Sequence, residues 1–190
     1  NPTIRSKIIF GIASTMKMIH QKNAIHRDLK LQNIFLDENF EPRIGGFELS
    51  KFRKEYPNMT ILTRLPTYLA PELFMDGDDD YGTSVDVYSY AFILYEMFSN
   101  KITFDGPKKP HSHHQYLMFI SRGKRPKRPE NIPDRYWDLI NKCWAQDPSK
   151  RPTFEEIVEI LKSDKYGIEE FGMKTDLDEL HNYQDRIEQE

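Results

Sequence analysis

Apolar residues recur at steps of three and four over the first twenty positions. They are Ile4, Ile8, Ile12, Met16 and Ile19. This spacing is the period of an α-helix with one buried face. Asn1 followed by Pro2 fits a helix cap with proline in the first turn. The pattern therefore predicts a helix over 4–19.

A small hairpin is predicted next. A short apolar run at 33–36 is followed by Asp37-Glu38-Asn39, which is typical of a turn, and then by Arg43-Ile44. The two runs are expected to pair as strands within 33–44. Beyond them, 51–64 shows no clear period and is expected to be a mobile loop.

The second half of the chain is predicted to be helical. Val85 to Phe98 is apolar on nearly all sides, so a buried helix is expected there. Shorter helices are expected at 116–121, 136–144 and 154–161, and a loop rich in Pro, Gly and His at 101–114. The tail after Ser163 is mostly acidic and is interpreted either as a frayed extension or as an amphipathic segment. The fold class is therefore mostly α with a small β-hairpin.

Composition narrows the classes of partner. The formal net charge is −3 over 190 residues, so no overall basic field favours nucleic acid or an acidic membrane surface. No apolar run approaches the length of a membrane span and no signal-peptide pattern opens the chain, so a cytoplasmic protein is expected. The single cysteine, Cys143, excludes an internal disulfide. Because the first residue is Asn, the sequence is interpreted as a piece of a longer protein or a truncated gene model.

The strongest chemical signal lies between the predicted helix and the hairpin. Residues 26–33 read His-Arg-Asp-Leu-Lys-Leu-Gln-Asn. In this pattern Asp28 can accept or orient the proton of an attacking hydroxyl, and Lys30 can neutralise a moving phosphate. Asn33, five positions after the Asp, can turn back to hold a metal ion. The alternative is a chance polar loop, but a pattern of eight positions makes chance a poor explanation.

This segment resembles the catalytic loop of protein kinases, H-R-D-L-x-x-x-N. Residues 3–52 resemble the stretch from the E helix into the activation segment of a tyrosine-kinase-like Ser/Thr kinase, and Lys30 favours the Ser/Thr type. The likeness continues through Ala-Pro-Glu at 70–72, the start of the F helix at 86–90 and the closing block at 143–152. It implies the C-terminal lobe of the kinase fold over 1–163, with the N-lobe absent and 164–190 as an acidic extension. It also implies that ATP and Mg²⁺ are the cofactors and that Lys30 and Asn33 contact them. A protein substrate or signalling partner is implied as well.

The resemblance assigns structural roles as well. Glu72 and Arg151 are expected to form a mostly buried ion pair. Asp86 is expected to lie beneath the catalytic loop and to bond to its backbone near His26 and Arg27.

Arg27 also has a regulatory interpretation. An Arg next to the catalytic Asp can pair with a phosphorylated residue of the activation segment, for which Thr60 and Thr63 are the candidates. The alternative, that Arg27 only packs and bonds locally, stays open.

Three departures from the family pattern matter for activity. Gly46 stands where the metal-binding Asp of Asp-Phe-Gly belongs, and Glu48 stands where the Gly belongs. Glycine supplies no oxygen ligand for magnesium. Leu65 replaces the Thr that would bond the catalytic Asp and Lys, and Thr67 compensates at most in part. No Gly-rich phosphate loop and no strand lysine are present in the chain.

These features divide the functional hypotheses. The sequence favours a catalytically impaired kinase domain that acts as a signalling scaffold and does not hold Mg²⁺–ATP tightly. The alternatives are an active Ser/Thr kinase once the chain is joined to an upstream N-lobe, and a non-functional gene fragment.

Three other groups are expected to be structural. The histidines at 111, 113 and 114 are interpreted as part of a solvated loop rather than a metal site. The aspartates at 78–80 lack the spaced ligands of a calcium loop. Cys143 is expected to be buried and unreactive.

Overall fold

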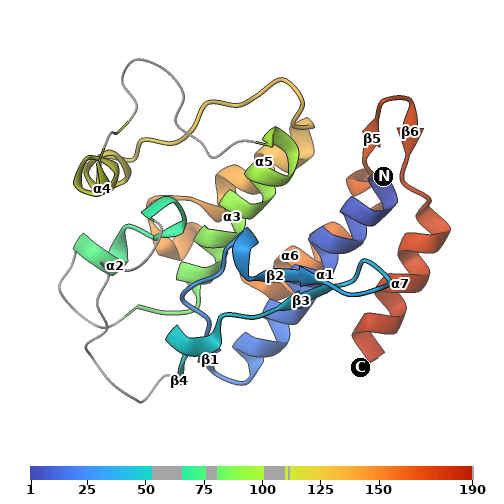
Figure 1. The fold of residues 1–190 in the computed structure, drawn as a ribbon, viewed down its shortest axis with the longest axis horizontal. Coiled ribbons are helices and arrows are strands. Elements are labelled where there is room, and N and C mark those ends of the chain that lie inside the picture. Colours follow the sequence, from blue (N-terminus) through green and yellow to red (C-terminus); the bar gives the residue numbers. More distant parts are fainter. Residues whose placement is uncertain (53–65, 76–80, 101–109, 111, 190) are drawn as a thin grey trace.

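The described residues form a helical body with three small two-stranded antiparallel sheets (Figure 1). A computed structural model describes residues 1–190 except 53–65, 76–80, 101–109, 111 and 190. The helices are α1 Pro2–Gln21, α2 Glu72–Met75, α3 Ser84–Ser99, α4 His113–Ser121, α5 Asp134–Cys143, α6 Phe154–Leu161 and α7 Leu177–Gln189. The paired strands are β1 Ala24–Ile25 with β4 Lys51–Phe52, β2 Ile34–Leu36 with β3 Pro42–Ile44, and β5 Glu169–Glu170 with β6 Met173–Lys174.

Helix α1 begins where the sequence predicted a cap. The Asn1 side chain accepts hydrogen bonds from the backbone N–H groups of Thr3, at 2.9 Å, and Ile4, at 3.3 Å. These are two of the donors that a helix start leaves without a partner. The buried surface differs from the single predicted stripe, because Ile9 and Phe10 are buried while Ile4 and Ile8 are only half-buried. The reason is that both α6 and α7 pack against α1.

Helix α3 is the centre of the core, as its all-round apolar pattern predicted. Every residue from Val85 to Glu96 is buried. The Phe92 ring packs on Trp144 with centroids 5.4 Å apart, and the Tyr90 ring packs on Phe154 at 5.3 Å. The Tyr90 hydroxyl donates to the Ile9 carbonyl at 2.9 Å, which links α3 to α1. A buried hydroxyl needs such a partner, because an unpaired one costs free energy.

The predicted hairpin is confirmed as β2 and β3. Ile34 lies opposite Ile44, and Leu36 lies opposite Pro42. The Asp37 carboxylate closes the turn by accepting from the backbone N–H of Asn39 at 2.9 Å and of Glu41 at 3.0 Å. This is the way in which Asp commonly stabilises a turn.

Two boundaries differ from the prediction. Residues 51 and 52 lie at the start of the predicted loop but form β4, which pairs with β1; a two-residue strand is too short to show a period. The rest of the predicted loop, 53–64, lies outside the described residues. Helix α4 begins at His113, inside the predicted loop. The Ser112 side chain caps it by accepting from the Gln115 N–H at 3.2 Å.

The acidic tail is folded. Of the two interpretations that the sequence left open, the amphipathic segment is the one observed: residues 169–174 form a hairpin and α7 packs along α1 (Figure 1). Leu180 and Tyr183 of α7 are buried, as is Ile168 before the hairpin. These three apolar side chains supply the buried face that the charged composition concealed.

Candidate active site

The segment 26–33 joins β1 to β2 and carries the candidate catalytic residues. Leu29 is fully buried and anchors the middle of the segment in the core. The Lys30 ammonium donates to Asp28 Oδ2 at 2.6 Å. Both side chains keep some contact with solvent. The ion pair holds a carboxylate and a cation side by side at the surface of the site.

Asn33 completes this pair. Its Nδ2 donates to Asp28 Oδ2 at 3.0 Å and to the Asp28 backbone carbonyl at 2.8 Å. Asp28 Oδ2 therefore accepts from both Lys30 and Asn33. The structure brings together all three residues that the sequence assigned to catalysis and metal binding.

Beneath the segment lies Asp86, which is 0% exposed. Its Oδ2 accepts from the His26 N–H and its Oδ1 from the Arg27 N–H, each at 2.8 Å. These are the contacts that the sequence predicted. His20 Nε2 also lies 2.9 Å from Oδ2, a partner that the sequence reasoning missed although His20 follows Met16 on the buried side of α1. Arg27 has a φ of +70°, an uncommon conformation that its bond to Asp86 holds.

His26 connects the catalytic segment to the backbone after β3. The Asp28 N–H donates to His26 Nδ1 at 3.3 Å, so Nδ1 is the acceptor and the proton lies on Nε2. Nε2 in turn donates to the Gly45 carbonyl at 2.9 Å. The Phe47 ring packs edge-on against the imidazole with centroids 4.8 Å apart. His26 therefore bridges the backbone of Asp28 and the backbone of Gly45.

Gly46 has a φ of +81°, in the left-handed region that favours glycine. A Cβ atom at this position would lie 2.5 Å from Asn33 Cγ and closer still to its Nδ2. At Gly45, a Cβ atom would lie 2.8 Å from the ring carbon Cε2 of Phe35. The side chains of Asn33 and Phe35 thus pack against Gly46 and Gly45, where a larger residue would not fit without a shift. The sequence treated Gly46 only as a lost ligand and gave no signal of this packing.

The other residues that the sequence analysis considered as partners or substitutes at this site are less well placed to act on Asp28. Glu48 lies in a 3-10 turn, Phe47–Leu49, and is exposed. Thr67 is buried, and its carbonyl accepts from the Tyr116 hydroxyl at 3.1 Å. Within the described part of the chain, Thr67 makes no hydrogen bond to Asp28 or Lys30. Leu65 lies outside the described residues.

The predicted ion pair between Glu72 and Arg151 is present. Arg151 Nη2 donates to Glu72 Oε2 at 2.9 Å, and the Arg151 side chain is 0% exposed. The same guanidinium donates to the carbonyls of Ala145 and Ser84. It stacks on the Tyr88 ring at 5.0 Å, and Arg125 stacks on that ring at 5.1 Å. Arg125 is a partner that the sequence analysis did not anticipate.

Arg27 lies over the Tyr81 ring, with its guanidinium carbon 5.3 Å from the centroid. Its Nε is buried and makes no hydrogen bond within the described residues. Thr60 and Thr63, the predicted phosphate sites, lie outside those residues. The regulatory hypothesis for Arg27 therefore stays a prediction.

Metal-ligand clusters are not found elsewhere in the described ranges: no group of three or more His, Cys, Asp or Glu side chains could hold an ion there. His111 and the aspartates at 78–80 are not among the described residues. Cys143 is fully buried, and burial raises the pKa of its thiol, so the reactive thiolate is disfavoured as predicted. None of the described helices has the length and apolarity needed to cross a membrane.

Comparison with known proteins identifies the family. The model of the protein kinase domain matches residues 2–161. RGS domain-containing serine/threonine-protein kinase A of Dictyostelium discoideum is 36% identical over 159 residues, covering 84% of this chain and 14% of that protein. Serine/threonine-protein kinase STY17 of Arabidopsis thaliana is 33% identical over 159 residues, covering 82% of this chain and 26% of that protein. The chain belongs to the protein kinase domain family.

The relatives are Ser/Thr protein kinases, a family that uses ATP and Mg²⁺ and acts on proteins. This chain spans about a quarter or less of the length of these two relatives. The family is therefore established for the chain, and the activity of the whole protein is a matter for proposal.

Proposed function

We propose that residues 1–163 are the C-terminal lobe of a tyrosine-kinase-like Ser/Thr kinase domain that is impaired in phosphoryl transfer and acts as a signalling scaffold. On this proposal, residues 164–190 are an extension of that lobe and the N-lobe is its intramolecular partner. The surface of the lobe then binds a signalling protein, and this chain functions in the cytoplasm.

The residues that act on a protein hydroxyl are retained. Asp28 has the position to orient the hydroxyl proton, and Lys30 has the position to neutralise a transferring phosphate. General base catalysis of this kind contributes about 10²–10⁴-fold to a rate. Most of the acceleration in phosphoryl transfer comes from positioning and from charge neutralisation by metal ions.

The donor set does not fit a magnesium ion. Asp28 Oδ2 already accepts from Lys30 and Asn33, and Asn33 itself offers a single amide oxygen, Oδ1. Gly46 brings no oxygen, and Asn33 occupies the place in which a side chain at 46 would begin. Magnesium demands near-octahedral oxygen ligands. This packing of Asn33 against Gly46 is the observation that carries the proposal.

The test uses the longest natural protein that contains this chain. We expect it to transfer no more phosphate from Mg²⁺–ATP to a generic Ser/Thr substrate than its Asp28→Asn variant does. The double variant Gly46→Asp with Glu48→Gly restores the family residues and serves as the matched comparison. We expect Gly46→Asp alone to stay inactive, because Asn33 and a side chain at 46 exclude one another in the observed conformation.

A second candidate function is an active Ser/Thr kinase assembled with an upstream N-lobe. The observation in its favour is the intact arrangement of Asp28, Lys30 and Asn33 above Asp86. If the natural protein phosphorylates the substrate and Asp28→Asn abolishes the signal, this second function is correct, and Glu48 or another group holds the metal. If neither the natural protein nor any interaction partner can be detected in its cell, the scaffold role fails as well.

Regulation through Arg27 is part of the same proposal. A phosphate on Thr60 or Thr63 is a charge partner for the guanidinium, whose Nε lacks a hydrogen bond within the described residues. Mass spectrometry of the protein from its native cell checks this, and both threonines unmodified under all conditions would count against it.

A further inference from the structure

The segment after Ser163 follows the residues that the family model matches, yet it is bound tightly along α1. Its acidic side chains meet basic side chains of α1 in three pairs: Arg5 with Glu170, Lys7 with Glu179, and Lys17 with Glu188. A single exposed ion pair contributes little to stability, about 0–1 kcal/mol. Three such pairs along α1, one with β5 and two with α7, fix how the segment lies on α1.

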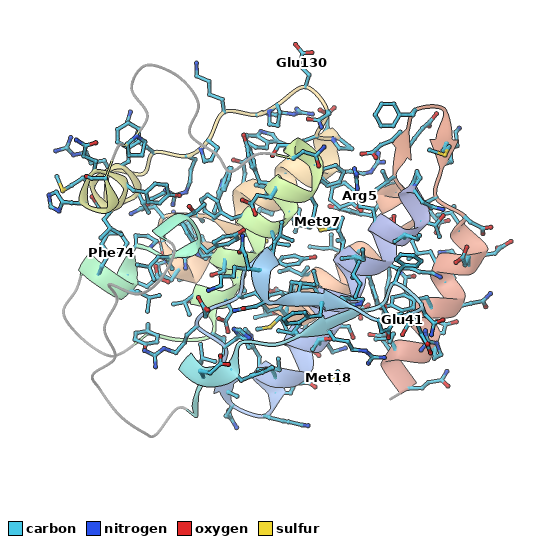
Figure 2. All side chains as sticks on the ribbon, viewed as in Figure 1. Arg5, Met18, Glu41, Phe74, Met97 and Glu130 are labelled. Carbon is cyan, nitrogen blue, oxygen red and sulfur yellow. The ribbon has the colours of Figure 1, made fainter. Side chains whose placement is uncertain are left out.

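Near its C-terminal end, α7 also makes an ion pair of the opposite polarity, in which it supplies the basic side chain. The Arg186 guanidinium donates to both carboxylate oxygens of Glu41, one of them at 3.5 Å. Glu41 lies in the turn between β2 and β3, and its side chain is 12% exposed. Figure 2 shows Glu41 on the side of the hairpin that faces α7. Helix α7 therefore reaches past α1 to the turn of the hairpin.

Packing reinforces this link. Tyr183 of α7 is buried, with the charged groups of Lys7 at 5.7 Å and Arg186 at 5.4 Å from its ring centroid. A Cβ atom on Gly11, in the middle of α1, would lie 2.6 Å from Pro42 Cγ and closer still to the Tyr183 hydroxyl oxygen. A glycine inside a helix costs about 0.5–1 kcal/mol relative to alanine. The space that Gly11 leaves is shared by one residue of α7 and one of β3.

We propose that α7 holds the β2–β3 hairpin in place, with Arg186 and Tyr183 as positioning residues for the candidate active site. The hairpin transmits the constraint, because Pro42 pairs with Leu36, Ile44 pairs with Ile34, and the Gly45 N–H donates to the Asn33 carbonyl at 2.8 Å. A two-stranded hairpin is marginal by itself. Its turn is anchored by α7 and its open end carries Asn33, so release of the turn loosens the residue that packs on Gly46. The proposal holds whether or not the site transfers phosphate.

Hydrogen exchange of the whole 190-residue chain tests the proposal. In Arg186→Glu, two carboxylates face one another at the hairpin turn. We expect the Gly45 amide to exchange about threefold to tenfold faster, which corresponds to a loss of about 0.7–1.4 kcal/mol of local stability. Amides in the centre of α3 should change by less than about twofold. We expect Glu41→Arg to act in the same way, and the double variant with both changes to restore the exchange of Gly45.

The matched control is Lys174→Glu, which makes the same change of charge in the exposed pair that Lys174 forms with Glu169 on the β5–β6 hairpin. It should leave the Gly45 amide unchanged. The NMR signals of the Asn33 side-chain amide give a second readout, and they should shift in Arg186→Glu and return in the double variant. An unchanged Gly45 amide in Arg186→Glu would overturn the proposal. So would equal acceleration of the amides of Gly45 and α3, or a double variant that exchanges as fast as the single ones.

Discussion

The catalytic segment is held at two ends that differ in chemistry. At one end the buried carboxylate of Asp86 accepts from two backbone N–H groups and lies beside His20. At the other end, the neutral amide of Asn33 packs against the backbone of Gly46. The first end fixes the conformation of the segment through hydrogen bonds, whereas the second depends on the fit of a side chain against a glycine. The two ends are therefore sensitive to different changes: the loss of a hydrogen-bond acceptor at Asp86, and the addition of a side chain at Gly46.

The largest effect is expected from removing the supporting carboxylate. Asp86→Ala leaves the N–H groups of His26 and Arg27 buried without their acceptor and gives up a buried charge with good partners. Removing one member of such an arrangement typically costs about 3–5 kcal/mol of the free energy of unfolding. Urea unfolding of the whole chain measures it. A loss below about 1 kcal/mol would mean that the segment is held by other contacts.

A second carboxylate, that of the half-buried Glu72, offers a test away from the loop. In Arg151→Ala it loses two hydrogen bonds from its cationic partner. We expect a loss of about 3 kcal/mol, at the lower end of the range for a broken buried pair, because Glu72 keeps some exposure to water. The measurement is again urea unfolding, with the exposed Lys174→Ala as the control, for which a change within about 0.5 kcal/mol is expected. Melting of Arg151→Ala like the parent would contradict the role of this pair.

The Gly46 end should be sensitive for a different reason. Gly46→Ala places a Cβ atom against Asn33 at a φ of +81°, so both the packing and the backbone oppose it. A loss of about 2 kcal/mol is expected, of which the left-handed backbone accounts for about 1–2. In the background of Asn33→Ala the same substitution should cost less, because the contact is gone. A double-mutant cycle measures the difference, and exact additivity would show that Asn33 does not pack on Gly46.

The smallest effect is expected at Glu96, a buried carboxylate that has few hydrogen-bond partners to offset the cost of its burial. Glu96 accepts from the Tyr68 hydroxyl, but its Oε1 makes no hydrogen bond within the described residues. Burial raises the pKa of Glu96 above its ordinary value of 4.5. The folded chain therefore binds this proton more tightly than the unfolded chain does, so the stability that it contributes is complete below about pH 4.5 and falls as the pH rises through the folded pKa.

The corresponding variant is Glu96→Gln, which stays neutral. At pH 7 it should melt about 3 °C above the parent, for a gain of about 1 kcal/mol. The difference should shrink toward zero as the pH is lowered below about 4.5. Thermal unfolding across this pH range measures it. A difference in Tm that does not depend on pH would show that Glu96 is uncharged or compensated at neutral pH.

Much of the support for the site could be predicted from the sequence. The spacing of Asp28, Lys30 and Asn33 places three polar groups in one short loop before a hairpin, and the resemblance led to the bonds of Asp86 and Arg151. The partners that were missed, His20 and Arg125, come from helices and loops distant in sequence, and a single sequence carries no record of which distant residues meet. The same holds for Phe35, whose ring lies over Gly45 although nothing in the pattern of the hairpin indicates it.

The sequence by itself determined helices α1, α3, α4, α5 and α6, the β2–β3 hairpin and the order of residues in the catalytic segment, because these depend on local periods, caps and turns. Only the tertiary structure decided what the two glycines at 45 and 46 do and where the acidic tail lies. A glycine has no side chain that makes contacts, so its structural role depends on which neighbouring side chain fills the space beside it. The apolar residues of the tail are too few and too scattered to indicate which face is buried. The position of its charged side chains depends on the basic side chains of α1 and on Glu41, with which they form ion pairs.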